Sequence, residues 1–228
     1  MSSIGPVIRK MFGRYEHDIS EAYRSIYIDI DAFVEQIRLW RPQATKVLEV
    51  GCGEGAVTER LNAAFPDSDI TAIDITPRVG RLYRGSRDRV RFIQCAVQEI
   101  ATAEAGHYDL VVLSDVLHHV PGEFRQSLLN AIRSAMAPGA VLVFKDWQRS
   151  NTPIHWLSYA SDRWITGDRI SYMTRQEMYG YLVRSFGEAA LRAETTVRPW
   201  RNNIAFLVAQ DPVLISTRYP SLRKSPLR

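Results

Sequence analysis

The residues with the clearest chemical meaning are two acids on either side of a glycine-rich turn. Glu49 comes just before Gly51-Cys52-Gly53-Glu54-Gly55, and Asp74 lies twenty-five residues after Glu49. Glycines let the chain turn sharply and bring backbone N–H groups close to a ligand. An ionised acid at Asp74 could accept both hydrogen bonds of a ribose diol. This pattern predicts a nucleotide-binding site.

Glu49 narrows the kind of nucleotide. A carboxylate just before the glycines would repel a pyrophosphate and attract a cationic amino-acid group. The pattern therefore favours a nucleoside that carries a sulfonium amino acid over NAD.

A second group of reactive side chains follows later in the chain. His118 and His119 come after an apolar run at 109–113, and Asp146 follows another at 140–144. Either histidine could take a proton near neutral pH. We predict His118, His119 and Asp146 as candidates for acid–base chemistry. A structural role stays open: the histidines could bond to the backbone, and Asp146 could pair with Lys145 or cap a helix.

Predicted strands and helices alternate between these residues. Strands are expected at 46–50, 69–73, 90–95, 109–113 and 140–144, and helices at 15–40, 56–65, 77–84, 124–136 and 174–186. Strands that are apolar throughout indicate a parallel sheet buried on both faces. Residues 191–197 and 204–209 predict an antiparallel hairpin at its edge. The fold class is therefore α/β, with a Rossmann-like, seven-stranded, mostly parallel sheet.

Aromatic residues gather in two segments outside this alternation. Tyr15, Tyr23 and Tyr27 fall near one face of the first helix. Residues 148–173, which include Tyr159, are longer than a usual connection in an α/β unit and follow Trp147 directly. These aromatic side chains either pack against the sheet edge or form a lid over a flat substrate. If these aromatic residues form a lid, all five of them are candidate substrate contacts, and so are His119 and Asp146.

The chain is accordingly divided into three parts. Residues 1–42 are interpreted as an N-terminal helical lid, 43–212 as the main domain with a lid insertion at 148–173, and 213–228 as a basic tail. The net charge is +4 at pH 7, with basic residues concentrated at 78–91 and in the tail. No run approaches the roughly 20 apolar residues needed to cross a bilayer, and the first residues do not read as a signal peptide. The chain has two cysteines, and we expect a reducing, cytoplasmic location.

Four segments together resemble the class I S-adenosylmethionine-dependent methyltransferases. Val-Leu-Glu-Val-Gly-Cys-Gly-Glu-Gly at 47–55 resembles motif I, and residues 72–75 resemble the second-strand acid that holds the ribose. Residues 108–112 with 117–120 resemble the fourth-strand block. Residues 128–144, with their Pro-Gly turn, are similar to the helix and fifth strand that follow. The matches keep the family's order over residues 46–146.

The resemblance implies S-adenosylmethionine as methyl donor and S-adenosylhomocysteine as product. It implies donor contacts at Glu49, Gly51, Cys52, Gly53, Asp74, Ile75, Ala96, Val97, Gln98, Ser114 and Asp115. No metal site is expected. The sequence most resembles enzymes that modify quinones and secondary metabolites, so the expected partner is a small-molecule acceptor. Methyl transfer from a sulfonium depends mainly on alignment, which can supply roughly 7–11 kcal/mol. A base is needed only when the acceptor carries a proton of high pKa.

One position departs from the family pattern. Where the family commonly has an acid that binds the adenine amino group, this chain has Cys95-Ala96-Val97-Gln98, with Ala96 in the place of the acid. Adenine recognition would then depend on backbone groups near Val97, with Gln98 as a possible substitute.

Three other functions stay open. An RNA-modifying methyltransferase is disfavoured because residues 114–117 lack the Asn/Asp-Pro-Pro-aromatic run of base-amino methylation, and neither cysteine is placed as a nucleophile. An NAD-dependent oxidoreductase fits the glycines but not Glu49. A non-catalytic binding module on the same fold is the third. The acceptor, its methylated atom and the oligomeric state do not follow from the sequence.

Overall fold

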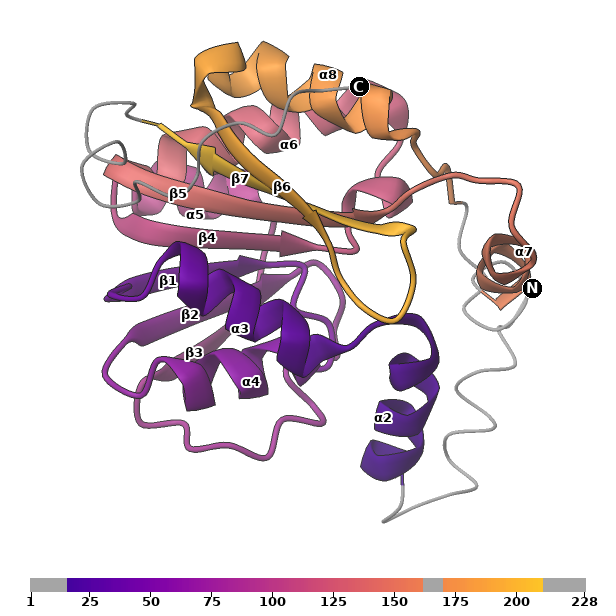
Figure 1. The fold of residues 1–228 in the computed structure, drawn as a ribbon. Helices are drawn as coiled ribbons and strands as arrows, with labels where there is room; N and C mark the ends of the chain where they lie inside the picture. The colour runs from indigo at the N-terminus through magenta and orange to yellow at the C-terminus, as the bar shows by residue number, and fades with distance from the viewer. Residues whose placement is uncertain (1–15, 162–169, 211–228) are drawn as a thin grey trace.

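The molecule is built on a seven-stranded sheet with strand order β3-β2-β1-β4-β5-β7-β6 (Figure 1). The computed structural model describes residues 16–161 and 170–210. The strands are β1 (Lys46–Val50), β2 (Asp69–Asp74), β3 (Val90–Gln94), β4 (Tyr108–Ser114), β5 (Met136–Trp147), β6 (Leu191–Thr196) and β7 (Asn203–Ala209). The first five are parallel, and β7 runs antiparallel to both β5 and β6. The predicted fold class, including the closing hairpin, is confirmed.

Helices cover both faces of the sheet. Helices α3 (Ile30–Trp40) and α4 (Ala56–Ala64) pack on one face, and α5 (Val97–Ala103), α6 (Gly122–Ala135) and α8 (Arg175–Phe186) pack on the other (Figure 1). Neighbouring residues of one strand face opposite layers: Val47 belongs to the core with α3, and Leu48 to the core with α6. Burial on both faces explains why these strands are apolar throughout rather than alternating.

The predicted helix at 15–40 is divided in two. Helix α2 (Glu16–Tyr27) ends before Asp29, whose side chain accepts a hydrogen bond from the N–H of Ala32 at 2.8 Å and caps α3. Helix α3 is a layer of the core, with Phe33 and Ile37 fully buried. The interpretation of residues 1–42 as one lid is therefore wrong for α3. Within the described residues, α2 alone of this pair lies beyond the carboxyl ends of the strands (Figure 1).

Two further differences concern short segments. The helix predicted at 77–84 is a series of turns, because Asp74 accepts from the N–H of Thr76 and the N–H of Gly80 donates to the carbonyl of Gly53. Helix α5 was not predicted. It begins where the side chain of Glu99 accepts from the N–H of Ala96 at 2.8 Å.

The insertion after β5 contains helix α7 (Pro153–Ser161), which lies on the same side of the molecule as α2 (Figure 1). Trp147 joins it to β5 by donating from Nε1 to Nδ1 of His155 at 3.0 Å. Tyr15, residues 162–169 and the basic tail lie outside the described residues, as do the side chains of Tyr23 and Tyr159. No described helix is long and apolar enough to cross a membrane.

Candidate active site

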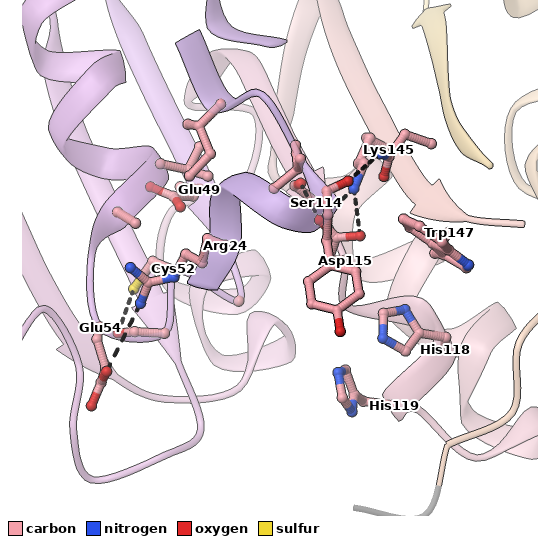
Figure 2. A pocket seen from close by; sticks show the side chains of 18 of the residues that line it. Arg24, Glu49, Cys52, Glu54, Ser114, Asp115, His118, His119, Lys145 and Trp147 are labelled. Atoms are coloured by element: carbon pink, nitrogen blue, oxygen red, sulfur yellow. Dashed lines mark hydrogen bonds and ion pairs between the residues drawn. The ribbon is translucent and has the colours of Figure 1, made fainter. Parts of the chain in front are cut away.

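A cavity of about 300 Å³ lies at the carboxyl ends of β1, β4 and β5 (Figure 2). Its walls come from the glycine turn after β1, from α2, from the loop after β4, from the end of β5 and from Tyr172. Ligands of open α/β sheets bind beyond the carboxyl ends of the strands. Most of the sequence-predicted reactive residues are therefore brought to one place.

The glycine turn is fixed by backbone bonds to β2. Gly51 and Cys52 both donate to the carbonyl of Ile73, at 2.8 and 3.0 Å, and Gly53 donates to a carboxylate oxygen of Asp74 at 2.8 Å. Gly51 has a φ of +76°, and a Cβ there would lie 2.2 Å from a methyl of Val116. Only glycine fits this position. Gly51, Cys52 and Gly53, which the sequence predicts as donor contacts, line the cavity.

Five of the other predicted donor contacts, at the ends of β2 and β3, do not line the cavity. Asp74 is half-buried beside the turn, Ile75 is exposed, Ala96 is the N-cap residue of α5, and Val97 is buried at the start of that helix beside exposed Gln98. These residues lie at the ends of β2 and β3 rather than around the cavity. The cavity thus belongs to the part of the site nearest β1, β4 and β5.

Glu49 is a buried acid on the cavity wall. Its side chain is 3% exposed and accepts a hydrogen bond from the hydroxyl of Thr58 at 2.6 Å. Burial raises the pKa of Glu49 to about 7; the Thr58 bond opposes the rise and the nearby Asp74 adds to it. A cation bound in the cavity would favour its ionised form.

Helix α2 brings Arg24 to the same wall, and sequence reasoning missed this residue. Arg24 Nη2 lies 3.9 Å from Glu54 of the glycine turn, and Glu54 also accepts from Arg81 at 2.7 Å (Figure 2). An arginine on an amphipathic helix is usually a solvated residue, so its spacing gave no signal. The break at Asp29, which directs α2 away from the sheet, creates this contact.

His118 and Asp146 form a close pair in the loop after β4. His118 Nδ1 lies 2.5 Å from one carboxylate oxygen of Asp146, and the backbone N–H of His118 donates to the other at 3.1 Å. Burial would raise the pKa of Asp146, but the charge and hydrogen bond of His118 and the N–H of Trp147 outweigh it and hold that pKa below its ordinary value. An ionised Asp146 accepts, so His118 carries its proton on Nδ1 and Nε2 is the basic nitrogen.

Asp146 was predicted to contact the substrate, and the structure instead places it behind His118. Its side chain is fully buried and does not line the cavity. His118 and His119 do line it, with ring centroids 4.1 Å apart, and Tyr172 stacks on His118 at 4.9 Å. Tyr172 was not predicted as a site residue.

Lys145 pairs with Asp115 and not with Asp146. Its Nζ lies 2.6 Å from both carboxylate oxygens of Asp115, and both residues line the cavity (Figure 2). Successive residues of a strand point to opposite faces, which separates Lys145 from Asp146. Ser114, predicted with Asp115 as a donor contact, also lines the cavity and donates to Asp115 at 3.2 Å.

The predicted aromatic lid is partly described. Tyr27 and Trp147 both line the cavity and meet edge to face, with ring centroids 6.0 Å apart. Trp147 is buried against the core side of α7. The rings pack together and also face the cavity, so the lid interpretation stays a prediction for this pair.

The basic segment at 78–91 is largely neutralised by carboxylates. Arg81 pairs with Glu54, Arg89 with Asp69, and Arg91 with Glu104. A phosphate-binding surface needs such cations directed to the ligand. The segment is better described as a paired surface.

Comparison with known proteins identifies related sequences. The family model described as methyltransferase domain matches residues 15–187. A ubiquinone biosynthesis O-methyltransferase of Bordetella avium is 33% identical over 112 residues, which is 47% of this chain and 45% of that protein. One from Acinetobacter baumannii is 32% identical over 110 residues, covering 46% and 45%. The chain spans about half the length of the curated relatives it matches.

Solved structures share the fold at low identity. A Burkholderia thailandensis 1,6-didemethyltoxoflavin-N1-methyltransferase, with bound 1,6-didemethyltoxoflavin and S-adenosylhomocysteine, has a TM-score of 0.62 and 17% identity, covering 90% of this chain and 87% of that one. An N-methyltransferase of Bradyrhizobium japonicum has a TM-score of 0.54 and 19% identity, covering 78% and 93%. These likenesses establish the fold.

Proposed function

The chain belongs to the methyltransferase domain family, and from this premise we propose that it transfers a methyl group from S-adenosylmethionine to a hydroxyl oxygen of a flat small molecule. His118, which lines the cavity and is paired with Asp146 behind it, carries the proposal. A base fixed beside the cavity serves an acceptor that must lose a proton, and a hydroxyl is such an acceptor.

The charges around the glycine turn support the donor. S-adenosylmethionine carries a sulfonium and an ammonium beside a carboxylate. Glu49, whose pKa is about 7, would ionise beside the donor's cationic groups. Arg24, close to the same turn, offers a guanidinium to the donor's carboxylate. Asp74 and the backbone at Ile75 are assigned to the ribose, and Val97 with Gln98 to the adenine.

The aromatic residues support a flat acceptor. Tyr27, Trp147 and Tyr172 line the cavity on the side of the histidines. Aromatic walls bury planar groups and exclude water. The related proteins of Bordetella avium and Acinetobacter baumannii are named as O-methyltransferases of ubiquinone biosynthesis, which favours an oxygen acceptor on a ring.

In the mechanism, His118 is the general base and Asp146 its positioning residue. Asp146 holds the ring with the proton on Nδ1, so Nε2 accepts the proton of the acceptor hydroxyl. The oxygen then attacks the methyl carbon in line with the carbon–sulfur bond. The bonding electrons leave with sulfur, and S-adenosylhomocysteine remains. The protein's main task is alignment within about 3–3.5 Å.

Donor binding is tested first, by calorimetric titration. S-adenosylhomocysteine should bind and NAD should not, because Glu49 repels a pyrophosphate. Asp74→Ala should weaken binding by roughly 10- to 100-fold, from about 1.5–3 kcal/mol for bonds to a charged group. Asp88→Ala, an exposed acid of the loop before β3, is the matched control. Binding of NAD in place of S-adenosylhomocysteine would overturn the donor assignment.

Acceptor chemistry is tested with methyl-labelled donor. Catechols, hydroxyquinones and N-heteroaromatic compounds form the panel, with mass spectrometry of the products. Methylation of oxygen supports the proposal. Methylation of ring nitrogen alone would favour the second candidate, an N-methyltransferase, which the Burkholderia thailandensis structure suggests because its acceptor is a heteroaromatic ring.

The earlier alternatives have less support. Burial raises the pKa of the Cys52 thiol, so it is not a ready nucleophile for pyrimidine carbon methylation. Both cysteines are free thiols, which supports the cytoplasm as the compartment. A non-catalytic role predicts no transfer to any member of the panel.

A further inference from the structure

Lys145 is a fully buried cation on the wall of the cavity. Its side chain is 1% exposed, and its Nζ lies 2.6 Å from each carboxylate oxygen of Asp115. Removing the charge of Lys145 from water costs several kcal/mol, which the partly exposed Asp115 offsets in part. A buried cation that faces a ligand cavity therefore calls for a functional explanation.

Asp115 is held in an unusual backbone conformation. Its φ is +57°, the one positive φ at a non-glycine residue in the described chain. Such a residue persists because its surroundings hold it, and such residues cluster at functional sites. The N–H of Asp115 donates to the carbonyl of Lys145 at 2.9 Å, so backbone and side chain both fix Asp115 on Lys145. The strain keeps the ammonium at a set place beside the cavity.

The Lys145 ammonium has more hydrogen-bond donors than its bonds to Asp115 use. A lysine side chain has three N–H donors, and the two bonds to Asp115 account for two of them. The carboxyl group of Asp115 is the more solvent-accessible partner, with its side chain 36% exposed. Among the residues that the structure describes, these two bonds leave one donor of Lys145 for an oxygen placed in the cavity.

Lys145 is close to the proposed base. One ligand atom each from Asp115, His118 and Asp146 lies within 4.8 Å of the others, and Lys145 is bonded to the first of them. The ammonium and the proposed base therefore lie on the same part of the cavity wall.

We propose that the Lys145 ammonium holds the acceptor oxygen in its ionised form while the methyl group is transferred. The inference rests on the proposed function and adds a residue to it. His118 Nε2 takes the hydroxyl proton, and the resulting oxyanion stays beside Lys145 until it bonds to the methyl carbon. The carbon–sulfur bond breaks with its electrons on sulfur. The ammonium keeps its own proton throughout, so the balance is that of a simple methyl transfer.

Other titratable groups face the same cavity and must be considered in any pH measurement. They come from each element around it: Arg24 and Tyr27 from α2, Glu49 from β1, Cys52 and Glu54 from the glycine turn, Asp115, His118 and His119 after β4, and Tyr172 before α8. Lys145 is the one lysine among the residues that line the cavity. The Lys145 variant is therefore compared with the wild-type protein at a single pH, and the acidity of the acceptor hydroxyl is varied instead.

The first experiment observes ionisation directly. 4-Nitrocatechol absorbs at different wavelengths in its neutral and ionised forms and is more acidic than catechol. Bound to the wild-type protein with S-adenosylhomocysteine, at a pH where free 4-nitrocatechol is mostly neutral, it should show the ionised spectrum. The double variant Lys145→Met/Asp115→Asn removes both charges without leaving an unpaired one, and its complex should show the neutral spectrum.

The matched control is a second lysine–aspartate pair far from the cavity. Lys46 and Asp69 lie 2.5 Å apart at the opposite end of β1 and β2, both partly exposed. Lys46→Met/Asp69→Asn should keep the wild-type spectrum. Calorimetric titration measures the affinity of each variant for S-adenosylhomocysteine, because Asp115 is also a predicted donor contact, and the spectra are compared at saturating S-adenosylhomocysteine.

The second experiment measures turnover. A donor directed at a developing oxyanion contributes on the order of 10²–10³ in rate. The Lys145→Met/Asp115→Asn variant should lose roughly a hundredfold with catechol and much less with 4-nitrocatechol, which ionises readily without help. Lys145→Arg keeps the charge and should restore part of the catechol rate.

The outcomes separate this inference from the function on which it rests. Equal rate losses for the two acceptors, or an ionised spectrum in the double variant, would show that Lys145 is a structural partner of Asp115 only. If the wild-type protein neither binds nor methylates either catechol, the hydroxyl acceptor itself is wrong.

Discussion

His118 and Asp146 are joined at two points: ring Nδ1 lies 2.5 Å from one carboxylate oxygen, and the backbone N–H bonds to the other at 3.1 Å. The carboxylate therefore fixes both the position of the residue and the orientation of its ring. It also selects the tautomer with a basic Nε2.

Asp146→Asn should lower kcat by roughly 10²–10⁴ with little change in S-adenosylhomocysteine affinity. An amide can bond to the ring in the wrong tautomer and cannot stabilise the imidazolium that forms. Steady-state kinetics and calorimetric titration measure the two quantities. His118→Gln should show a loss of the same order, and the double variant should be no slower than either, because the two residues act as a unit. Additive losses would contradict the pairing.

Binding of the donor should release protons near neutral pH. Glu49 has a pKa of about 7, so at pH 6.5 it is mostly protonated in the free protein, and the donor's cation favours its ionised form. Calorimetric titration of S-adenosylmethionine in buffers of different ionisation enthalpy counts the protons. Glu49→Gln should release fewer. The same count in both proteins would place the donor's cation elsewhere.

The stability of the fold should fall as Glu49 ionises. The pKa of Glu49 in the folded protein lies above the ordinary glutamate value of about 4.5, so folding favours the protonated form. The contribution of protonated Glu49 to the free energy of unfolding is complete below about pH 4.5 and is lost as the pH rises through about 7. The free energy of unfolding should fall by roughly 3 kcal/mol, because each unit of pKa shift corresponds to about 1.36 kcal/mol. Urea unfolding of wild type and Glu49→Gln at pH 5 and pH 8 tests this: the wild type should lose more stability than the variant between the two.

Gly51→Ala should destabilise the protein and abolish donor binding. The new Cβ would lie 2.2 Å from Val116, which adds overpacking of about 1–3 kcal/mol to the backbone strain of a positive φ. Gly106→Ala has a similar φ of +65° with nothing within 4 Å of its Cβ, and it isolates the strain. Thermal unfolding should rank Gly51→Ala below Gly106→Ala. Adding Val116→Ala should recover part of the difference.

Arg24→Met should weaken S-adenosylhomocysteine binding by roughly 10- to 100-fold, because a charge-assisted bond to the carboxylate contributes about 1.5–3 kcal/mol. Arg38→Met is the control: this arginine pairs with Glu35 on the exposed side of α3, away from the cavity. Decarboxylated S-adenosylmethionine, which lacks the carboxylate, should bind both proteins alike. A loss of affinity for that compound too would mean that Arg24 acts through the fold of α2.

The glycine turn, the place of Glu49 before it and the mostly parallel sheet could be predicted because each depends on local backbone needs or on burial of whole strands. Gly51 is required by its φ and by Val116, and both are encoded within one strand-turn-helix unit. The partner of Lys145 could not be predicted. Asp146 is adjacent to Lys145 in sequence, but successive residues of a strand point to opposite faces of the sheet. The partner is instead Asp115, which directly follows the neighbouring strand β4.

The failure at residues 15–40 has a similar cause. The apolar spacing runs through Tyr27 and Ile30 without interruption, and the helix is nevertheless broken by Asp29, which caps α3. The backbone N–H of Asp29 bonds to the carbonyl of Arg198 at 2.8 Å. A contact with a residue so distant in sequence leaves no trace in the helical period. Arg24 was missed for the same reason, since its place depends on this break.

The junction of α2 and α3 is held by the β6–β7 loop and the first residue of β7: Trp200 donates to the carbonyl of Ile26 and Asn203 to that of Tyr27, both at 2.6 Å. These pairs are 174 and 176 residues apart. On the ribosome, the first helix of the described chain therefore emerges long before its anchor. A nascent chain that has already formed β1 to β5 has the glycine turn and His118, but it lacks the support that holds Arg24 and Tyr27 over them. Competence for catalysis should thus arise only when translation reaches the last hairpin.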